Sequence, residues 1–152
     1  MTNDDIAREI LRARSYVVLA TADADGVPWA SPVWFAMESY AELYWVSYPD
    51  ARHSQNIAVR PQIAMVVFDS TVAPGSGQGV YMTAAAAQST DPGEIERGIG
   101  VFSRESAREG AGEFGLDEVT GQARLRLYRA SVQECWILDP DSPFDVRIGV
   151  TP

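Results

Sequence analysis

The segment from Leu43 to Ile57 contains residue types that bind anions in proteins. Its apolar first part ends at the hydroxyl of Ser47, and a short helix is predicted from Ala51 to Val59. The first turn of that helix carries a guanidinium, an imidazole and a hydroxyl, from Arg52, His53 and Ser54. Helix starts present unpaired N–H groups that favour phosphate, and arginine and serine donate hydrogen bonds to phosphate oxygens. The segment is therefore a candidate phosphate site. A salt bridge from Arg52 to Asp50, with the serines only capping the helix, is the alternative.

Two neighbouring segments allow a ligand-binding interpretation beside a structural one. A strand predicted from Val27 to about Met37 carries two tryptophans and a phenylalanine around a proline. Large flat side chains line a slot for a planar ring, or they form an ordinary aromatic core strand. The segment from Gly75 to Gly79 is typical of a flexible connector, or else it lets the Gln78 amide approach a ligand closely. It lacks the spacing and the following helix of a dinucleotide-binding loop.

Residue types that are absent or single exclude several kinds of chemistry. All 12 residues of the Lys+Arg count are arginines, which excludes a Schiff-base lysine and a Walker lysine. His53 is the only histidine and Cys135 the only cysteine, so no disulfide within the chain and no metal site with two imidazoles can form. Cys135 lies in an apolar run and is interpreted as a buried, inert thiol. No G-x-S-x-G motif supports a hydrolase triad around His53.

Length and composition predict one globular domain over residues 1–152. Hydrophobic residues make up 46% and charged residues 22%, which is ordinary for a folded protein in water. The formal net charge of −9 repels a nucleic-acid backbone, so no nucleic-acid partner is expected. The longest strongly apolar run, Ile63 to Phe68, is too short to cross a membrane, and the acidic start lacks the apolar segment of a secretory signal. We therefore expect a cytoplasmic protein without membrane contact.

The pattern of apolar residues predicts a mainly β chain with peripheral helices. Helices are expected over residues 3–14, with Asn3 as the N-cap, 51–59 and 92–108. Strands are expected over residues 16–21, 27–37, 43–48, 62–68, 80–89, 124–128 and 132–138. Asp23 to Gly26 has the composition of a hairpin turn. Pro32 requires a sheet edge or a bulge, because proline donates no ladder hydrogen bond. Strands connected mostly by hairpins favour a small antiparallel barrel of about six strands.

The order of these segments resembles that of the pyridoxamine 5′-phosphate oxidase-like superfamily, the flavin-binding split β-barrels. The resemblance runs from about Ile6 to Leu138 and is fairly specific in the order and spacing of its motifs. The motifs that carry it are Leu19–Thr21, Asp25–Pro28, Ser31–Phe35, Leu43–Ser47, Arg52–Ile57 and Arg60–Val67. It implies a six-stranded antiparallel split β-barrel of the FMN-binding type. It also implies a homodimer that binds FMN in two grooves at the interface and acts on a small molecule.

The resemblance also implies which residues contact FMN. The isoalloxazine ring would lie against the backbone of the strand residues Ala30, Ser31, Pro32, Val33 and Trp34. The phosphate would be held by Ser47, Arg52 and Ser54, with His53 in place of a second cation and Gln55 in the same helix start. Three residues would reach across from the partner chain, namely Gln78, Gly79 and Trp136.

The chain departs from the family members that make pyridoxal phosphate. Those enzymes carry an R-x-H pair near the C-terminus, whereas Asp145 to Gly149 contains no histidine, and the phosphate-binding lysine common in the family is missing. Vitamin B6 oxidation is therefore not expected, and the leading hypothesis is an FMN-dependent oxidoreductase with no catalytic side chain assigned. An F420-dependent reductase on the same fold is the first alternative. It ranks second because only Arg60 could extend a basic groove from Arg52. A flavin-binding or storage protein without turnover and a β-barrel without a cofactor are the others.

Overall fold

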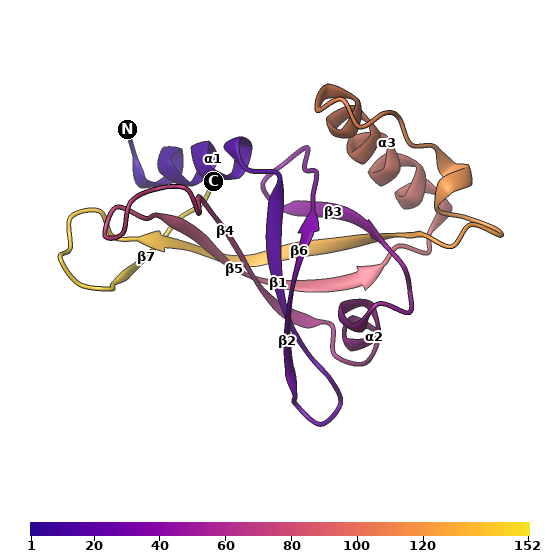
Figure 1. The fold of residues 1–152 in the computed structure, drawn as a ribbon, viewed down its shortest axis with the longest axis horizontal. Coiled ribbons are helices and arrows are strands. Elements are labelled where there is room, and N and C mark those ends of the chain that lie inside the picture. The colour runs from indigo at the N-terminus through magenta and orange to yellow at the C-terminus, as the bar shows by residue number, and fades with distance from the viewer.

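One antiparallel sheet forms the framework of the structure, a computed structural model that describes residues 1–152 (Figure 1). Its strands are β1 (Tyr16–Ala22), β2 (Pro28–Trp34), β3 (Glu42–Ser47), β4 (Gln62–Phe68), β5 (Gly79–Gln88), β6 (Arg126–Leu138) and β7 (Arg147–Gly149). They are hydrogen-bonded in the order β2-β1-β4-β5-β6-β3, and β7 pairs with β6. Every pair is antiparallel.

The sheet has seven strands and is not closed into a barrel by a continuous ladder. A single bridge joins the continuation of β2 to β3, where the N–H groups of Ala36 and Tyr44 donate to each other's carbonyls at 2.9 and 2.8 Å. The prediction of a mainly β chain with peripheral helices is confirmed. The structure differs from the predicted six-stranded barrel in the number of strands and in this open seam.

The C-terminal part of the sheet was predicted least well. Residues 124–128 and 132–138 were expected to be separate strands, but β6 runs without a break from Arg126 to Leu138. The irregular sequence produces only a bulge, at which Gln133 stands between the residues that pair with Thr83 and Ala84. β7 was not predicted at all, because three residues are too few to show a periodic pattern.

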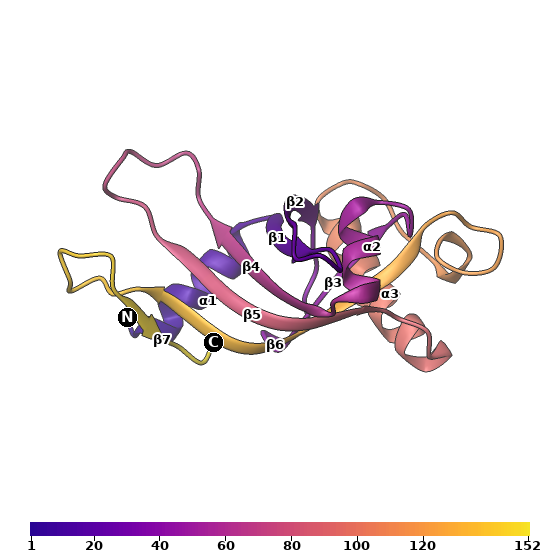
Figure 2. The same cartoon turned by 90° about the horizontal axis from the view of Figure 1, so that it is seen from below.

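Three helices cover the sheet at different places: α1 (Asn3–Ala13), α2 (Arg52–Val59) and α3 (Pro92–Arg108), with a short 3₁₀ turn at Leu116–Glu118 (Figures 1 and 2). Thr2, rather than Asn3, is the N-cap of α1, since its hydroxyl accepts from the Asp5 N–H at 3.1 Å. The Asp5 carboxylate completes the capping box by accepting from the Thr2 N–H at 2.9 Å. None of the helices has the length and apolar character that a membrane crossing requires.

Alternation along the strands separates the core from the outer face of the sheet. The inward residues of β1 and β4, such as Leu19 and Met65, are buried together with Trp45 of β3. Cys135 belongs to the same cluster. Burial raises the pKa of its thiol to about 11, so the thiol is neutral at pH 7, as the sequence predicts for an inert cysteine.

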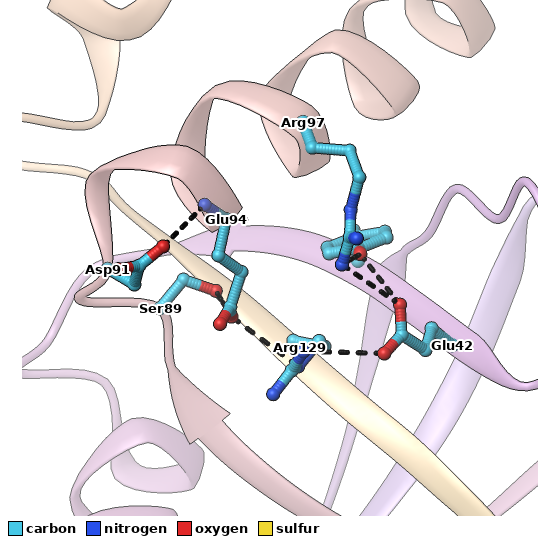
Figure 3. A network of polar contacts seen from close by, with 7 residues as sticks. Glu42, Ser89, Asp91, Glu94, Arg97 and Arg129 are labelled. Atoms are coloured by element: carbon cyan, nitrogen blue, oxygen red, sulfur yellow. Dashed lines mark hydrogen bonds and ion pairs between the residues drawn. The ribbon is translucent and has the colours of Figure 1, made fainter.

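A second apolar cluster and a polar network attach α3 to β3 and β6 (Figure 3). Glu42 of β3 accepts from Arg129 of β6 at 3.3 Å and lies 3.6 Å from Arg97 of α3. Arg129 also contacts Glu94 of α3 at 3.4 Å, and Glu94 in turn accepts from the Ser89 hydroxyl at 2.7 Å. These groups are all paired with one another, so the network serves to hold the helix against the sheet.

Candidate functional site

The start of α2 presents backbone N–H groups without partners. β3 ends at Ser47, and the turn that follows leads to the N-cap residue Ala51, whose side chain cannot cap the helix. The Gln55 N–H donates to the Ala51 carbonyl at 3.0 Å and is the first N–H to bond back into this turn. The three before it donate no hydrogen bond within the chain, those of Arg52, His53 and Ser54. This helix start therefore has the free donors that bind an anion.

Arg52 supplies an unpaired positive charge at this helix start. No carboxylate lies within 4.0 Å of its guanidinium, so the salt bridge to Asp50 is not formed. Instead, the guanidinium carbon lies 4.7 Å from the centroid of the Trp29 ring, in a cation–π contact. The charge of Arg52 therefore stays available to a ligand.

Ser47 and His53 are joined by a hydrogen bond between the Ser47 hydroxyl and the His53 Nε2, at 2.8 Å. Ser47 is buried and His53 half-buried. Burial lowers the pKa of His53, because the charged imidazolium is poorly solvated there. Without a ligand, His53 is therefore neutral at pH 7, and it becomes a cation only when an anion stabilises its charge.

The Ser54 hydroxyl faces the sheet instead of the helix start. Ser54 is 2% exposed and lines a cavity of about 200 Å³ with Ala86 and Tyr128. Its Oγ is buried and has no hydrogen-bond partner. A ligand on the outer side of the helix start would meet the Ser54 N–H but not this hydroxyl. The next residue, Gln55, is exposed.

Side chains of α2 fix the helix to the β1–β2 hairpin. The Asn56 amide donates to the Thr21 hydroxyl at 3.0 Å, and both residues are buried. Arg60, just after the helix, donates from Nε to the Asp23 carbonyl at 3.1 Å and from a terminal nitrogen to the Ala24 carbonyl at 3.2 Å. The hairpin turn predicted at residues 23–26 is confirmed, with Gly26 at a φ of 83°. The hairpin and the helix start thus keep a fixed relation.

The β2 residues predicted to contact a flavin ring divide between two faces. Pro32 pairs with Val18 and Ala30 with Ala20, and these pairs lie on the outer face of the sheet. Val33 is buried inside and Ser31 is half-buried on the same side. Because β2 ends the sheet order, Pro32 occupies the edge position that its missing N–H requires.

Trp34 belongs to the packing of α3. Its indole N–H donates to the Glu109 carboxylate at 2.8 Å, and its ring meets Phe102 edge-on with centroids 4.8 Å apart. The Trp34 side chain therefore has structural partners that account for its position.

Gln78 also has backbone partners that account for its amide. Its side-chain oxygen accepts from the Leu138 N–H at 2.8 Å, and its side-chain nitrogen donates to the Leu138 carbonyl at 2.8 Å. The Gly79 N–H donates to the same oxygen at 3.0 Å, and Gly79 is buried. This amide thus extends the β5–β6 pairing by one step.

Trp136 lies in an apolar groove on the outer face of the sheet. The groove has a volume of about 420 Å³ and crosses β1, β4, β5 and β6, where Ala64, Tyr81 and Trp136 contribute to its lining. Arg147 stands at its border, with the guanidinium carbon 4.3 Å from the centroid of the Tyr81 ring.

The structure therefore brings part of the predicted site together. Ser47, Arg52 and His53 meet around the start of α2, while Gln78 and Trp136 lie toward the other end of the sheet (Figure 2). Sequence analysis missed Trp29 as the support of Arg52, although its place in the aromatic strand was a signal. It also missed Arg147 beside the groove, for which the sequence gives no periodic signal.

The strand order and the anion-binding helix start after β3 define a protein of the pyridoxamine 5′-phosphate oxidase-like fold. Residues 4–137 match the family model of pyridoxamine 5′-phosphate oxidase, and the chain belongs to this family. The resemblance predicted from the order of the motifs is confirmed. Comparison with proteins of curated function gives no sequence match.

Solved structures with the same fold carry different descriptions. The heme storage protein HutZ from Vibrio cholerae is 22% identical, with a TM-score of 0.66 over 88% of this chain and 92% of that chain. An FAD-binding protein from Mesorhizobium loti is 20% identical, with a TM-score of 0.67 over 90% of this chain and 94% of that one. A heme binding protein from Mycobacterium smegmatis is 15% identical, with a TM-score of 0.71 over 98% of this chain and 58% of that one. At these identities the likeness establishes the fold alone.

Proposed function

We propose that this protein is an FMN-dependent oxidoreductase that acts on a small molecule. The observation that carries the proposal is the start of α2, where three unbonded N–H groups lie beside the Arg52 guanidinium, which has no carboxylate partner. FMN ends in a phosphate dianion, which matches these donors in charge and geometry. When bound, FMN supplies hydride or electron transfer at its isoalloxazine ring, and the protein binds and orients it.

Three side-chain and backbone features would hold the phosphate. The Arg52 guanidinium offers a fork of parallel N–H donors, and the N–H groups of the first turn lie beside it. The imidazole of His53, oriented by its hydrogen bond to Ser47, would add a charge-assisted donor on protonation. The Ser54 hydroxyl has no part in this arrangement.

The charges around Arg52 favour FMN over F420, whose longer tail carries more negative charge. Arg60, which could extend a basic groove, is already hydrogen-bonded to the carbonyls of Asp23 and Ala24. The first turn of α2 holds no second arginine. A single phosphate therefore suits the donors on this side better than a polyanionic tail.

The outer face beside β2 suits a flat apolar ring. Ala30 and Pro32 of β2 lie next to Ala20 and Val18 of β1 on this face. These side chains cannot exchange protons, so their part would be to orient the ring and exclude water. The proposal therefore assigns no acid–base catalyst to the protein.

We further propose a homodimer in which a second copy covers the outer face of the sheet. The groove across β1, β4, β5 and β6 is lined mostly by apolar side chains, among them Ala64, Val66 and Trp136. An apolar surface of this size is costly to leave in water, which favours its burial against a partner. The partner's Gln78, Gly79 or Trp136 would complete the cofactor groove, as the family resemblance implies.

A charge in the middle of this face should separate the dimer. In Ala64→Arg, an arginine replaces an exposed alanine on β4, and burying it at an interface would leave an unpaired charge. We expect a monomer by sedimentation equilibrium and weaker FMN binding. Ala107→Arg adds the same charge at an exposed position of α3 and should leave the mass unchanged. Equal masses for the two variants and the original chain would contradict the covered face.

His53 should make FMN binding depend on pH. Its pKa is lowered in the free protein, and a bound phosphate would raise it, so binding takes up a proton. We expect the affinity for FMN to rise as the pH falls from 8 toward about 6, below which phosphate itself protonates. Titration of flavin fluorescence across this range measures the effect.

The same imidazole has the opposite effect on the stability of the free protein. Its folded pKa lies below the unfolded value of 6.5, so the unfolded chain binds more protons between the two values. The unfolding free energy should therefore fall as the pH falls through that window. His53→Gln should flatten both its own contribution to stability and the pH slope of binding. An unchanged slope of FMN affinity in this variant would exclude His53 from the phosphate site.

The absorbance and released cofactor mass of the purified protein test the proposed function directly. A flavin spectrum and the mass of FMN are expected, with F420 or heme as the outcomes that would replace it. A heme would need an axial ligand, and the one imidazole is already bonded to Ser47 through Nε2. Oxidation of NADH or NADPH with bound FMN then distinguishes an enzyme from a protein that only stores flavin.

A further inference from the structure

Trp29 lies directly beneath the only cation at the start of α2. Its ring centroid is 4.7 Å from the Arg52 guanidinium carbon, and the residue is 42% exposed on the edge strand β2. The other tryptophans are placed differently. Trp45 is fully buried, Trp34 is bonded to Glu109, and Trp136 lines the outer groove.

A set of buried contacts fixes the Trp29 backbone relative to α2. Trp29 pairs with Thr21 across the hairpin, and the Thr21 hydroxyl donates to the Trp29 carbonyl at 3.4 Å. The same hydroxyl accepts from the Asn56 amide of α2 at 3.0 Å. Together with Arg60 on the hairpin turn, this chain of contacts holds the ring and the helix start in one frame.

The position of Arg52 has no other support in the structure. It makes no ion pair, and no hydrogen bond of its guanidinium to the chain is present. A long side chain without partners samples many rotamers, and ordering it on binding weakens affinity. An aromatic face is able to hold a guanidinium while leaving its N–H edge free for an anion.

We propose that Trp29 is a positioning residue for the cofactor phosphate, which holds the Arg52 guanidinium on its ring so that the N–H edge is ready to receive the anion. This inference rests on the proposed function of the α2 start. Trp29 itself touches neither the phosphate nor the reacting ring, and it acts only through Arg52.

Replacing the ring while keeping an apolar side chain tests this role. Trp29→Leu should weaken FMN binding roughly five-fold, in line with the usual strength of a cation–π contact. Trp29→Phe keeps an aromatic face and should restore part of the loss. Tyr48→Leu removes a comparable contact, with Arg124 at 5.4 Å, and serves as the matched control with unchanged affinity.

The coupling between Trp29 and Arg52 separates positioning from general stability. In an Arg52→Gln background, Trp29→Leu should cause no further loss of FMN affinity, because the ring then has no cation to hold. The Arg52 Nε–H proton resonance of the cofactor-free protein gives a second readout. It should be shifted by the ring current in the original chain and return toward its free value in Trp29→Leu.

The outcomes distinguish this inference from the proposed function. Unaltered FMN affinity in Trp29→Leu, or the same loss with and without Arg52, would overturn the positioning role. No FMN binding by the original chain would overturn the proposed function instead, while the resonance of Arg52 would still report the contact. If Trp29→Leu fails to fold, Trp29→Phe and the resonance shift decide.

Discussion

Arg52→Ala is expected to weaken FMN binding roughly 10- to 100-fold, the range for losing hydrogen bonds to a charged group. The guanidinium is the one permanent cation at the start of α2, and no carboxylate competes for it. The backbone N–H groups remain in the variant, so binding should become weak without disappearing. Equilibrium titration by quenching of flavin fluorescence measures the change.

Two further variants make this expectation specific. Arg52→Lys keeps the charge but loses the fork of N–H donors, and its affinity should lie between those of the original chain and Arg52→Ala. Arg104→Ala removes the same charge from the exposed side of α3, where Arg104 pairs with Glu38 at 3.2 Å. Equal affinities in Arg104→Ala and Arg52→Ala would mean that only the net charge matters, and the phosphate site would have to lie elsewhere.

The phosphate site was predictable because its parts are close in sequence. A strand end, a turn and a helix start follow one another from Ser47 to Ser54, and local patterns suffice to place them. The fold class followed from the alternation of strands such as β1 and β4, whose predicted bounds agree closely with the structure. What a local pattern could not give is the direction of a side chain, which is why the Ser54 hydroxyl was expected at the helix start but faces the sheet.

Contacts between distant segments were beyond the sequence. Gln78 bonds to Leu138, 60 residues away, and nothing near Gln78 indicates that partner. Trp29 and Arg52 meet because α2 packs on the β1–β2 hairpin, a tertiary arrangement that neither segment encodes alone. The unpredicted strand β7 likewise depends on a neighbour, since three residues form a strand only where β6 offers a free edge.

The attachment of α3 shows how closely such an arrangement depends on a single residue. Gly98 is buried where α3 crosses β3 and β6. A Cβ at this position would lie 2.7 Å from the Tyr44 ring and 2.8 Å from a Leu127 methyl, closer than carbon atoms can approach. Tyr44 is itself held by Glu42 through a 2.9 Å hydrogen bond, so the ring cannot easily yield. The helix is therefore able to lie this close to the sheet only with glycine at residue 98.

Gly98→Val should consequently lower the unfolding free energy by about 3 kcal/mol or more, because the branched side chain forces α3 away from the sheet. Gly100→Ala is the matched control on the same helix, since a Cβ there meets only the Arg104 side chain at 3.8 Å. It should stabilise the protein by up to about 1 kcal/mol through helix propensity. Urea unfolding followed by tryptophan fluorescence measures both changes, and Trp34, which packs on Phe102 of α3, reports the displacement. A Gly98→Val variant as stable as Gly100→Ala would show that α3 is free to move, and the close approach would then have no role in holding the fold.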